Sequence, residues 1–290
     1  MSNPRTEINW SANARKAGRA VHNALGWALG IVLLSPLFWM ISASFKKNDF
    51  AVFSFPIEWI PMQPTLHAYQ FIFKGSAYVN YIQSLLNSLF VVGLITAGSF
   101  LTCILAAYAF SKIQFAGRNA IFMFFIVCMA VPGEVLFVPT LAIFNVLGLI
   151  DTLWALIIPS IFANIFGVFL IRQNFASIPK ELTEAAVIDG APNLAILFRI
   201  MAPLAKESII TFLLLQFTWV WNDYQGPLLW INSKENYTVA YALAMLRSVS
   251  DSSTPVLMAG SVISLMPVIV LVVFFQKYFE KNVISAGIKG

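Results

Sequence analysis

Charged side chains are scarce in this chain. They make up 11% of its 290 residues, while hydrophobic residues make up 59%. Soluble domains carry about 25% charged residues. Too few charges remain here to cover a surface in water, which excludes an ordinary soluble enzyme or binding domain. The composition therefore predicts a membrane protein that crosses the bilayer several times.

Histidine and cysteine are also rare, with two of each. His22 and His67 stand alone near the ends of apolar runs, which excludes a histidine metal site or general base. Cys103 and Cys128 lie inside such runs without CxxC spacing and are typical of small core residues. No cluster of His, Asp and Glu shares a face within an apolar run. We therefore expect no metal site, no cofactor bound by the chain itself and no catalytic site within the membrane.

A phosphate-binding loop is missing as well, because the sequence contains no GxxxxGK[ST] motif. The chain is therefore predicted not to hydrolyse ATP itself. Its net charge of +5 comes from Lys and Arg residues that are scattered through loops rather than grouped with aromatic residues. This scatter excludes nucleic acid as a partner and is typical of a membrane protein.

Long apolar runs are what the sequence does contain, and about six spans of roughly twenty residues fit its length. The predicted spans are residues 25–45, 84–110, 119–147, 153–171, 207–222 and 256–275. The fold class is therefore all-α, a polytopic membrane protein with six transmembrane helices. The predicted domains are a cytoplasmic N-terminal segment, a six-span transmembrane domain and a cytoplasmic tail, at residues 1–24, 25–277 and 278–290.

Two of the spans have distinctive compositions. The second is rich in Gly, Ala and Ser, which allow helices to approach closely in lipid, and is therefore predicted to lie in the core of the bundle. The third is interrupted by Val131-Pro132-Gly133-Glu134. Proline removes a helical hydrogen bond, so we expect a kink there, beyond the midpoint of the span. The fourth is expected to end at Arg172.

Basic residues predict the side of the membrane that each loop faces. Thirteen lie on one side of the six-span arrangement: Arg5, Arg15, Lys16, Arg19, Lys112, Arg118, Arg172, Lys180, Arg199, Lys206, Lys277, Lys281 and Lys289. Five lie on the other: Lys46, Lys47, Lys74, Lys234 and Arg247. Because cytoplasmic loops carry the excess of positive charge, both termini and the loop at residues 173–206 are predicted to be cytoplasmic.

Within that loop, residues 180–203 read KELTEAAVIDGAPNLAILFRIMAP. The first part is rich in helix formers, Gly190 is the residue type that commonly follows a helix end, and Pro192 suits the first turn of a helix. The pattern therefore predicts two short helices joined at a tight corner, Asp189-Gly190-Ala191.

The first of these helices has the composition of a docking surface. Ala185 and Ala186 are expected to leave one side nearly flat, and Glu181, Glu184 and Asp189 place acidic groups around it. Another protein could approach such a surface closely and be held by charge. The alternative is an ordinary helix–turn–helix connector between two spans.

This loop resembles the EAA loop of ABC importer permeases. The matching residues are Glu184, Ala185, Ala186, Asp189, Gly190, Ile200 and Pro203. One departure is Ala202, where the family often has leucine, and we expect it to alter local packing only. The resemblance implies that these residues form a coupling helix that lies in a cleft of an ATPase subunit.

Other segments extend the resemblance to the MalG-like permease subunits of bacterial carbohydrate importers. They are Asn87-Ser88-Leu89, Ala106-Ala107-Tyr108-Ala109, Phe169-Leu170-Ile171-Arg172-Gln173, Ile178-Pro179-Lys180-Glu181-Leu182, Trp221-Asn222-Asp223 and Ala286-Gly287-Ile288-Lys289-Gly290. The resemblance covers the chain from about the first span to the last residue, and the order and spacing of these segments together make it specific.

What this resemblance implies is the type I importer permease fold in the inner membrane of a bacterium, with both termini cytoplasmic. The implied partners are a second homologous permease subunit, two ABC ATPase subunits that bind ATP and Mg, an extracytoplasmic solute-binding protein and membrane lipid. The implied cargo is a sugar or oligosaccharide. The tail is expected to contact the ATPase through Gly287, Lys289 and Gly290.

Polar residues within or beside the predicted spans are candidates for the substrate pathway. An intramembrane carboxylate such as Glu134 is costly to desolvate and therefore indicates function. The other candidates are Asn87, Asn164, Trp221, Asn222 and Asp223. The alternatives are solvation of Glu134 in an outer vestibule, and hydrogen bonds between helices or interfacial positions for the others.

Two other functions remain open from the sequence. One is an ABC permease for another solute, such as glycerol phosphate, a peptide or an amino acid, since the EAA loop is shared beyond carbohydrate importers. The other is a self-sufficient secondary transporter. Against the latter, no inverted repeat is found, and Glu134 is the only carboxylate well within a span, which is little for ion coupling.

Overall fold

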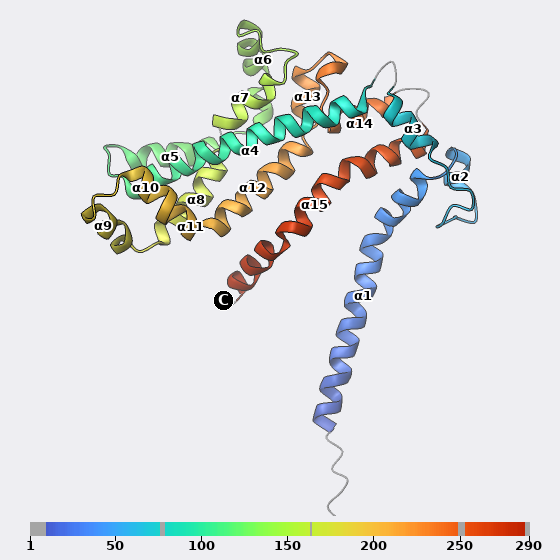
Figure 1. The fold of residues 1–290 in the computed structure, drawn as a ribbon, viewed down its shortest axis with the longest axis horizontal. Coiled ribbons are helices and arrows are strands. Elements are labelled where there is room, and N and C mark those ends of the chain that lie inside the picture. Colours follow the sequence, from blue (N-terminus) through green and yellow to red (C-terminus); the bar gives the residue numbers. More distant parts are fainter. Residues whose placement is uncertain (1–9, 76–78, 163, 249–252, 288–290) are drawn as a thin grey trace, which may run out of the picture. The chain divides into compact units, whose positions relative to one another are not determined.

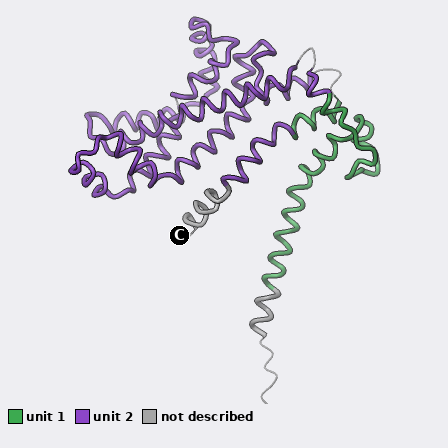
Figure 2. The backbone as a smooth tube through the Cα atoms, viewed as in Figure 1, with its two compact units in different colours: residues 1–70, 253–262 green, residues 71–252, 263–290 purple. Residues whose placement is uncertain are grey.

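The computed structural model describes residues 10–75, 79–162, 164–248 and 253–287 (Figure 1). Within these ranges the chain consists of helices and connecting loops and contains no strand, which confirms the all-α fold class. The chain forms two compact units. One contains residues 1–70 and 253–262, and the other contains residues 71–252 and 263–290 (Figure 2).

Helix lengths agree with the predicted spans. Four helical stretches are long and apolar enough to cross a membrane: Gly18–Ser44, Tyr81–Lys112, Trp154–Ser177 and Thr254–Phe275. The third of them combines the helices Trp154–Phe162 and Ile165–Ser177. Two bent helix pairs raise the number to six if each pair crosses once: Arg118–Cys128 with Gly133–Val146, and Asn193–Leu204 with Lys206–Trp221. The described residues are thus consistent with six spans.

The first unit holds α1, α2 and the beginnings of α3 and α15, which are Trp10–Ser44, Asp49–Phe53, His67–Lys74 and Thr254–Gly287. Hydrogen bonds fix the loop that follows α1. The Thr65 N–H donates to the Phe45 carbonyl at 2.7 Å, and the Ser44 and Tyr69 hydroxyls lie 2.9 Å apart. The Phe45 and Tyr69 rings also pack, with centroids 5.3 Å apart. The proline-rich segment after the first span is therefore folded back onto the end of α1.

The second unit is built around α4, which packs against α7, α8, α12 and α14 (Figure 1). Its helices up to the polar loop are α4 (Tyr81–Lys112), α5 (Arg118–Cys128), η1 (Gly133–Leu136), α6 (Phe137–Val146), α7 (Trp154–Phe162) and α8 (Ile165–Ser177). Those that follow are α9 (Lys180–Ile188), α10 (Asn193–Ile196), η2 (Leu197–Met201), α11 (Ala202–Leu204), α12 (Lys206–Trp221), α13 (Gln225–Trp230), η3 (Lys234–Asn236) and α14 (Val239–Ser248).

Small and hydroxyl side chains explain the central position of α4. A Cβ at Gly98 would lie 2.7 Å from the Ile161 side chain on α7, so the two backbones approach more closely than any larger residue allows. The Ser99 hydroxyl donates to the Ser160 carbonyl at 3.1 Å, and the Thr102 hydroxyl donates to the Ile161 carbonyl at 2.6 Å. These contacts place the second predicted span in the core of this unit, as its composition indicates.

The third predicted span is broken rather than kinked. The axes of α5 and of the η1–α6 pair meet at 95°. Pro132 has extended backbone angles, φ −61° and ψ 134°, so the helix stops completely before η1 begins. The break therefore divides the span near its middle, and its predicted position beyond the midpoint is wrong.

Two helices extend past their predicted ends. The fourth span was predicted to end at Arg172, but its helix α8 continues to Ser177. The Arg172 guanidinium lies 3.9 Å from the centroid of the Phe122 ring, and its Nε donates to the Phe110 carbonyl at 3.2 Å, which stabilises a charge within the helix. The last helix, α15, reaches Gly287, so residues 278–287 of the predicted tail are helical.

Candidate functional site

The polar loop forms the predicted pair of helices at the C-terminal end of α4 (Figure 1). We call residues 180–204, from α9 to α11, the hairpin. Gly190 forms its corner with φ +76°, a left-handed conformation that favours glycine. The Gly190 N–H donates to the Val187 carbonyl at 3.0 Å, and the Ala191 N–H donates to the Ala186 carbonyl at 2.9 Å. This closes the end of α9 at the predicted position.

Helix α9 has two unlike faces. Ala186 is buried and belongs to the hydrophobic core of the second unit together with Ile196 and Leu197. Glu184 and Ala185 are exposed. The prediction that the two alanines form one flat open side is therefore wrong. Successive helical positions point about 100° apart, so only one of them can face outward when the other packs inward.

The exposed surface of α9 and its corner is largely apolar and acidic. Val187 and Ile188 are 60% and 86% exposed, although both are large aliphatic residues. Glu181, Glu184 and Asp189 are exposed beside them. An exposed apolar patch bordered by charges is typical of a surface that binds another protein.

The second half of the hairpin passes through a wide helical turn. Residues Leu197–Met201 form a π-helix, and the Ala202 N–H donates to the Leu197 carbonyl. Proline cannot donate a backbone hydrogen bond, so this wide turn comes just before Pro203. Ile200 and Ala202 are half-buried against the core, whereas Pro203 is exposed. Of the predicted coupling residues here, Ile200 therefore helps to hold the hairpin and Pro203 lies at its surface.

Specific bonds attach the hairpin to the long helices. The Tyr108 hydroxyl on α4 donates to Asn193 Oδ1 at 3.1 Å. Lys112 Nζ, at the end of α4, donates to the Ile178 carbonyl at 2.9 Å, just before α9. Leu197 is fully buried in the same core. The hairpin is therefore bonded and packed directly to α4, and only Ile178 and Pro179 separate it from α8.

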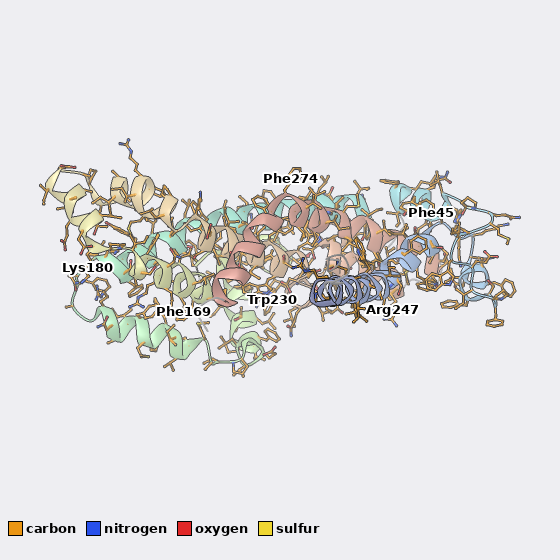
Figure 3. The ribbon with its side chains drawn as sticks, turned by 90° about the horizontal axis from the view of Figure 1, so that it is seen from below. Phe45, Phe169, Lys180, Trp230, Arg247 and Phe274 are labelled. Atoms are coloured by element: carbon orange, nitrogen blue, oxygen red, sulfur yellow. The ribbon has the colours of Figure 1, made fainter. Side chains whose placement is uncertain are left out.

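A cavity of about 500 Å³ lies between α9 and the end of α4. Its walls are Tyr108, Ser111, Lys112, Gln114, Lys180, Thr183, Glu184, Val187, Ile188, Asn193 and Ile196. Figure 3 shows the position of Lys180, the first residue of α9, which is well separated from Trp230 in the same unit. All of these residues belong to that unit. The site thus combines an exposed helical corner with an adjacent hollow of the size that binds ligands or partner side chains.

Three of the substrate-pathway candidates make hydrogen bonds within the chain. Asn87 Nδ2 donates to the Glu235 and Tyr237 carbonyls at 2.7 and 3.0 Å. Asn164 caps α8 by accepting from the Gly167 N–H at 2.8 Å, and it donates to Gln216. Trp221 is 3% exposed and donates to the Ser264 carbonyl at 3.0 Å. Each side chain therefore makes the hydrogen bonds that the alternative expected, and its part in the substrate pathway stays a prediction.

The other three candidates lie at breaks between helices. Asp223 is half-buried and caps α13 by accepting from the Gln225 and Gly226 N–H groups, both at 3.0 Å. Burial raises its pKa, although these two bonds act in the opposite direction. Asn222 and Glu134 have exposed side chains, Asn222 directly after α12 and Glu134 in η1. Asn222 Nδ2 donates to the Thr218 carbonyl at 2.8 Å, which leaves its amide oxygen available at the surface.

Similarity to known proteins shows which family this chain belongs to. Residues 98–285 match the family described as binding-protein-dependent transport system inner membrane component. This chain belongs to that family. The permease is 33% identical to the arabinooligosaccharides transport system permease protein AraQ of Bacillus subtilis, covering 90% of this chain and 92% of that one. It is also 33% identical to the inner membrane ABC transporter permease protein YcjP of Escherichia coli, with the same two shares covered.

A solved structure supports the fold of the permease. A chain from the crystal structure of a bacterial ABC transporter involved in the import of the acidic polysaccharide alginate has a TM-score of 0.77 with it. The two are 25% identical, and the match covers 96% of the permease and all of the other chain. The MalG-like resemblance and the importer permease fold are thereby confirmed. The chain is a membrane component of an ABC transport system of the inner membrane.

Sequence reasoning missed two residues that organise the permease. Gln216 is 4% exposed in the middle of α12 and accepts the Asn164 bond. Asp151, with φ +61°, accepts from the Asn232 and Ser233 N–H groups at 2.9 and 2.8 Å and joins two distant loops. Burial alone would raise the pKa of Asp151, but the bonds from Ser233 and Asn232 hold it below its ordinary value. The only sign of this role in the sequence is that Asp151 is a single polar residue before an apolar run.

The predicted ATPase contact in the tail of the permease lies at the limit of the described structure. Gly287 is the last residue of α15. Lys289 and Gly290 lie outside the described residues. Their contact with an ATPase stays a prediction.

Proposed function

We propose that this permease forms half of the channel of an ATP-driven importer for an oligosaccharide. The cargo class is supported by the names of relatives, which include permeases for arabinooligosaccharides and, in Bacillus subtilis, galactooligosaccharides at 30% identity. The other half would be a second homologous permease subunit. An extracytoplasmic binding protein would deliver the sugar, and lipid would surround the six spans.

Two ABC ATPase subunits would supply the energy, with ATP and Mg bound on those subunits. The sequence of this chain contains no phosphate-binding loop of its own, so its role is transport without catalysis. The distribution of basic residues supports a cytoplasmic hairpin and cytoplasmic termini. The division into residues 1–24, 25–277 and 278–290 follows the same orientation.

The observation that carries this proposal is the form of the hairpin. Its outer surface exposes Glu184, Val187 and Ile188, while its inner surface is bonded and packed to α4 and α8. A partner that grips the outside would therefore move the spans inside. The nucleotide would shift the equilibrium between the open and closed states only by the difference in its affinity for the two states. Glu134 and Asn222, the two exposed candidates, would contact the hydroxyl groups of the sugar.

Reversal of one charge on the hairpin tests the docking role. A Glu184→Lys variant is expected to co-purify with the ATPase subunits about tenfold less well, because it places a positive charge where a basic partner group would be held. The matched control is Glu235→Lys, an exposed acidic residue in η3 that lies outside the hairpin and its cavity. The measurement is the ratio of ATPase to permease after affinity purification. Equal ratios for Glu184→Lys and the unchanged protein would contradict the proposal.

A further inference from the structure

One wall of the cavity beside the hairpin is formed by residues outside the hairpin. Lys180, Thr183, Glu184, Val187 and Ile188 of α9 line the cavity. These positions are spaced i, i+3, i+4, i+7 and i+8, so they form a single face of the helix. The opposite wall comes from the last turn of α4 and the residues after it: Tyr108, Ser111, Lys112 and Gln114. The cavity therefore joins the coupling helix to a transmembrane helix.

We propose that this cavity is a socket for a segment of the ATPase subunit, so that the end of α4 is a second docking element outside the hairpin. The proposal rests on the function proposed above. It adds that the exposed face of α9 with Glu184, Val187 and Ile188 is one wall of the cavity, so that the partner that contacts this face also inserts side chains between α9 and α4. The lining that would receive it includes Ser111, Lys112 and Gln114, which no motif in the loop contains.

Charge identifies the kind of occupant. Lys112 and Lys180 place two positive groups in the wall, and Glu184 places a negative group in the same wall. Within the described residues of this unit, no ion pair joins Glu184 to either lysine. Lysine four residues before glutamate is the less favourable order for a pair along a helix. An occupant that carries a carboxylate toward the lysines and a basic group toward Glu184 would neutralise all three.

These charges favour a protein segment over an anionic lipid. A lipid phosphate would bind the two lysines but would be repelled by Glu184. It would also leave the apolar lining uncovered, because Val187 and Ile188 are 60% and 86% exposed and Ile196 is buried at the cavity wall. A segment with an apolar side chain between charged ones matches both features, and about 500 Å³ is enough for a few side chains.

The socket would give the ATPase a direct connection to a span. Lys112 lies in the last turn of α4 and is bonded to the Ile178 carbonyl just before α9. A segment held between α9 and α4 would pull on both when the ATPase subunits change state. Helix α4 packs against α7, α8, α12 and α14, so its displacement would reach most of the second unit.

Photo-cross-linking in the assembled transporter tests this proposal. A benzophenone amino acid is placed at position 114, whose side chain is exposed and lines the cavity, or at position 119 as the control. Asn119 is also exposed and lies only five residues further along, but it does not line the cavity. We expect position 114 to cross-link to the ATPase about tenfold more than position 119. Cross-linking to lipid, or equal yields from the two positions, would overturn the proposal.

A cavity-filling variant gives an independent measurement. Ser111→Trp would occupy the socket without changing any residue of the hairpin, and it is expected to lower oligosaccharide-stimulated ATP hydrolysis about tenfold. Asn119→Trp is the control, because it adds the same ring at an exposed position that does not line the cavity, and it is expected to leave hydrolysis unchanged. If Glu184→Lys weakens ATPase binding while Ser111→Trp works normally and position 114 gives no ATPase cross-link, the socket is wrong and the importer function stands. If Glu184→Lys has no effect, the importer function and the socket both fail.

Discussion

A Gly190→Val variant is expected to insert into the membrane normally but to lose about 90% or more of its ATP-driven transport. Gly190 has φ +76°, a region that costs a residue with a side chain about 1–2 kcal/mol and a β-branched residue more. A Cβ there would meet no atom within 4 Å, so the cost comes from the backbone and not from a clash. The corner would relax to a different angle and displace Glu184 and Ile188 from their docking positions.

Two measurements separate this effect from misfolding. The amount of variant in the membrane reports insertion, and transport with ATP hydrolysis reports coupling. Gly190→Asn is the matched control, because asparagine tolerates left-handed angles better than other residues with side chains, and it should keep most of the transport. Normal transport by Gly190→Val would show that the shape of the corner is unimportant for coupling.

A Gly167→Ala variant should be destabilised by about 1–3 kcal/mol, through overpacking of the core. The added Cβ would lie 2.4 Å from the Phe212 ring and 2.9 Å from Cys103 Sγ. Both neighbours are at most 1% exposed, so neither can move aside easily. The substitution would force α8 away from α12 and α4, the helices that carry the hairpin.

Thermal unfolding of the purified permease in detergent measures this loss. A Gly167→Ala, Phe212→Leu double variant should recover part of it, because leucine removes the ring atoms that the new Cβ would meet. Gly93→Ala is the matched control. It adds a methyl group to α4 with nothing within 4 Å, and it should leave stability unchanged or raise it slightly. An unchanged midpoint for Gly167→Ala would refute the close packing described here.

The sequence predicted those features that depend on local composition. Apolar runs indicated the spans, and Gly190 marked a corner that the structure confirms with φ +76°. A kink at Pro132 was predicted because proline removes a helical hydrogen bond. Composition alone does not distinguish this site from Pro36, Pro159 and Pro267, which lie inside continuous helices. The 95° angle at Pro132 could not be predicted, since it depends on how the two pieces pack.

Features that depend on partners distant in sequence were not predictable. Asn164 and Trp221 were polar and aromatic residues of unknown contact until Gln216 and Ser264 were placed beside them. Arg172 was predicted to end a helix because a charge is costly in an apolar run, but Phe122 stabilises it within α8. Likewise, Ala186 is buried because its side of α9 covers the hydrophobic core. Ala185 and Ala186 are the same residue type, so the sequence alone could not show which of the two is buried.

The central claim is that hydrolysis of ATP by partner subunits moves this permease through its hairpin. Oligosaccharide uptake by proteoliposomes that contain the whole transporter tests it most directly, with ATP supplied on one face at a time. A membrane-impermeant thiol reagent, applied to an Asp189→Cys variant, identifies the face that exposes the corner. We predict uptake only when ATP is present on that face and the binding protein is on the other. Uptake without ATP, or with ATP on the face opposite the corner, would contradict the account.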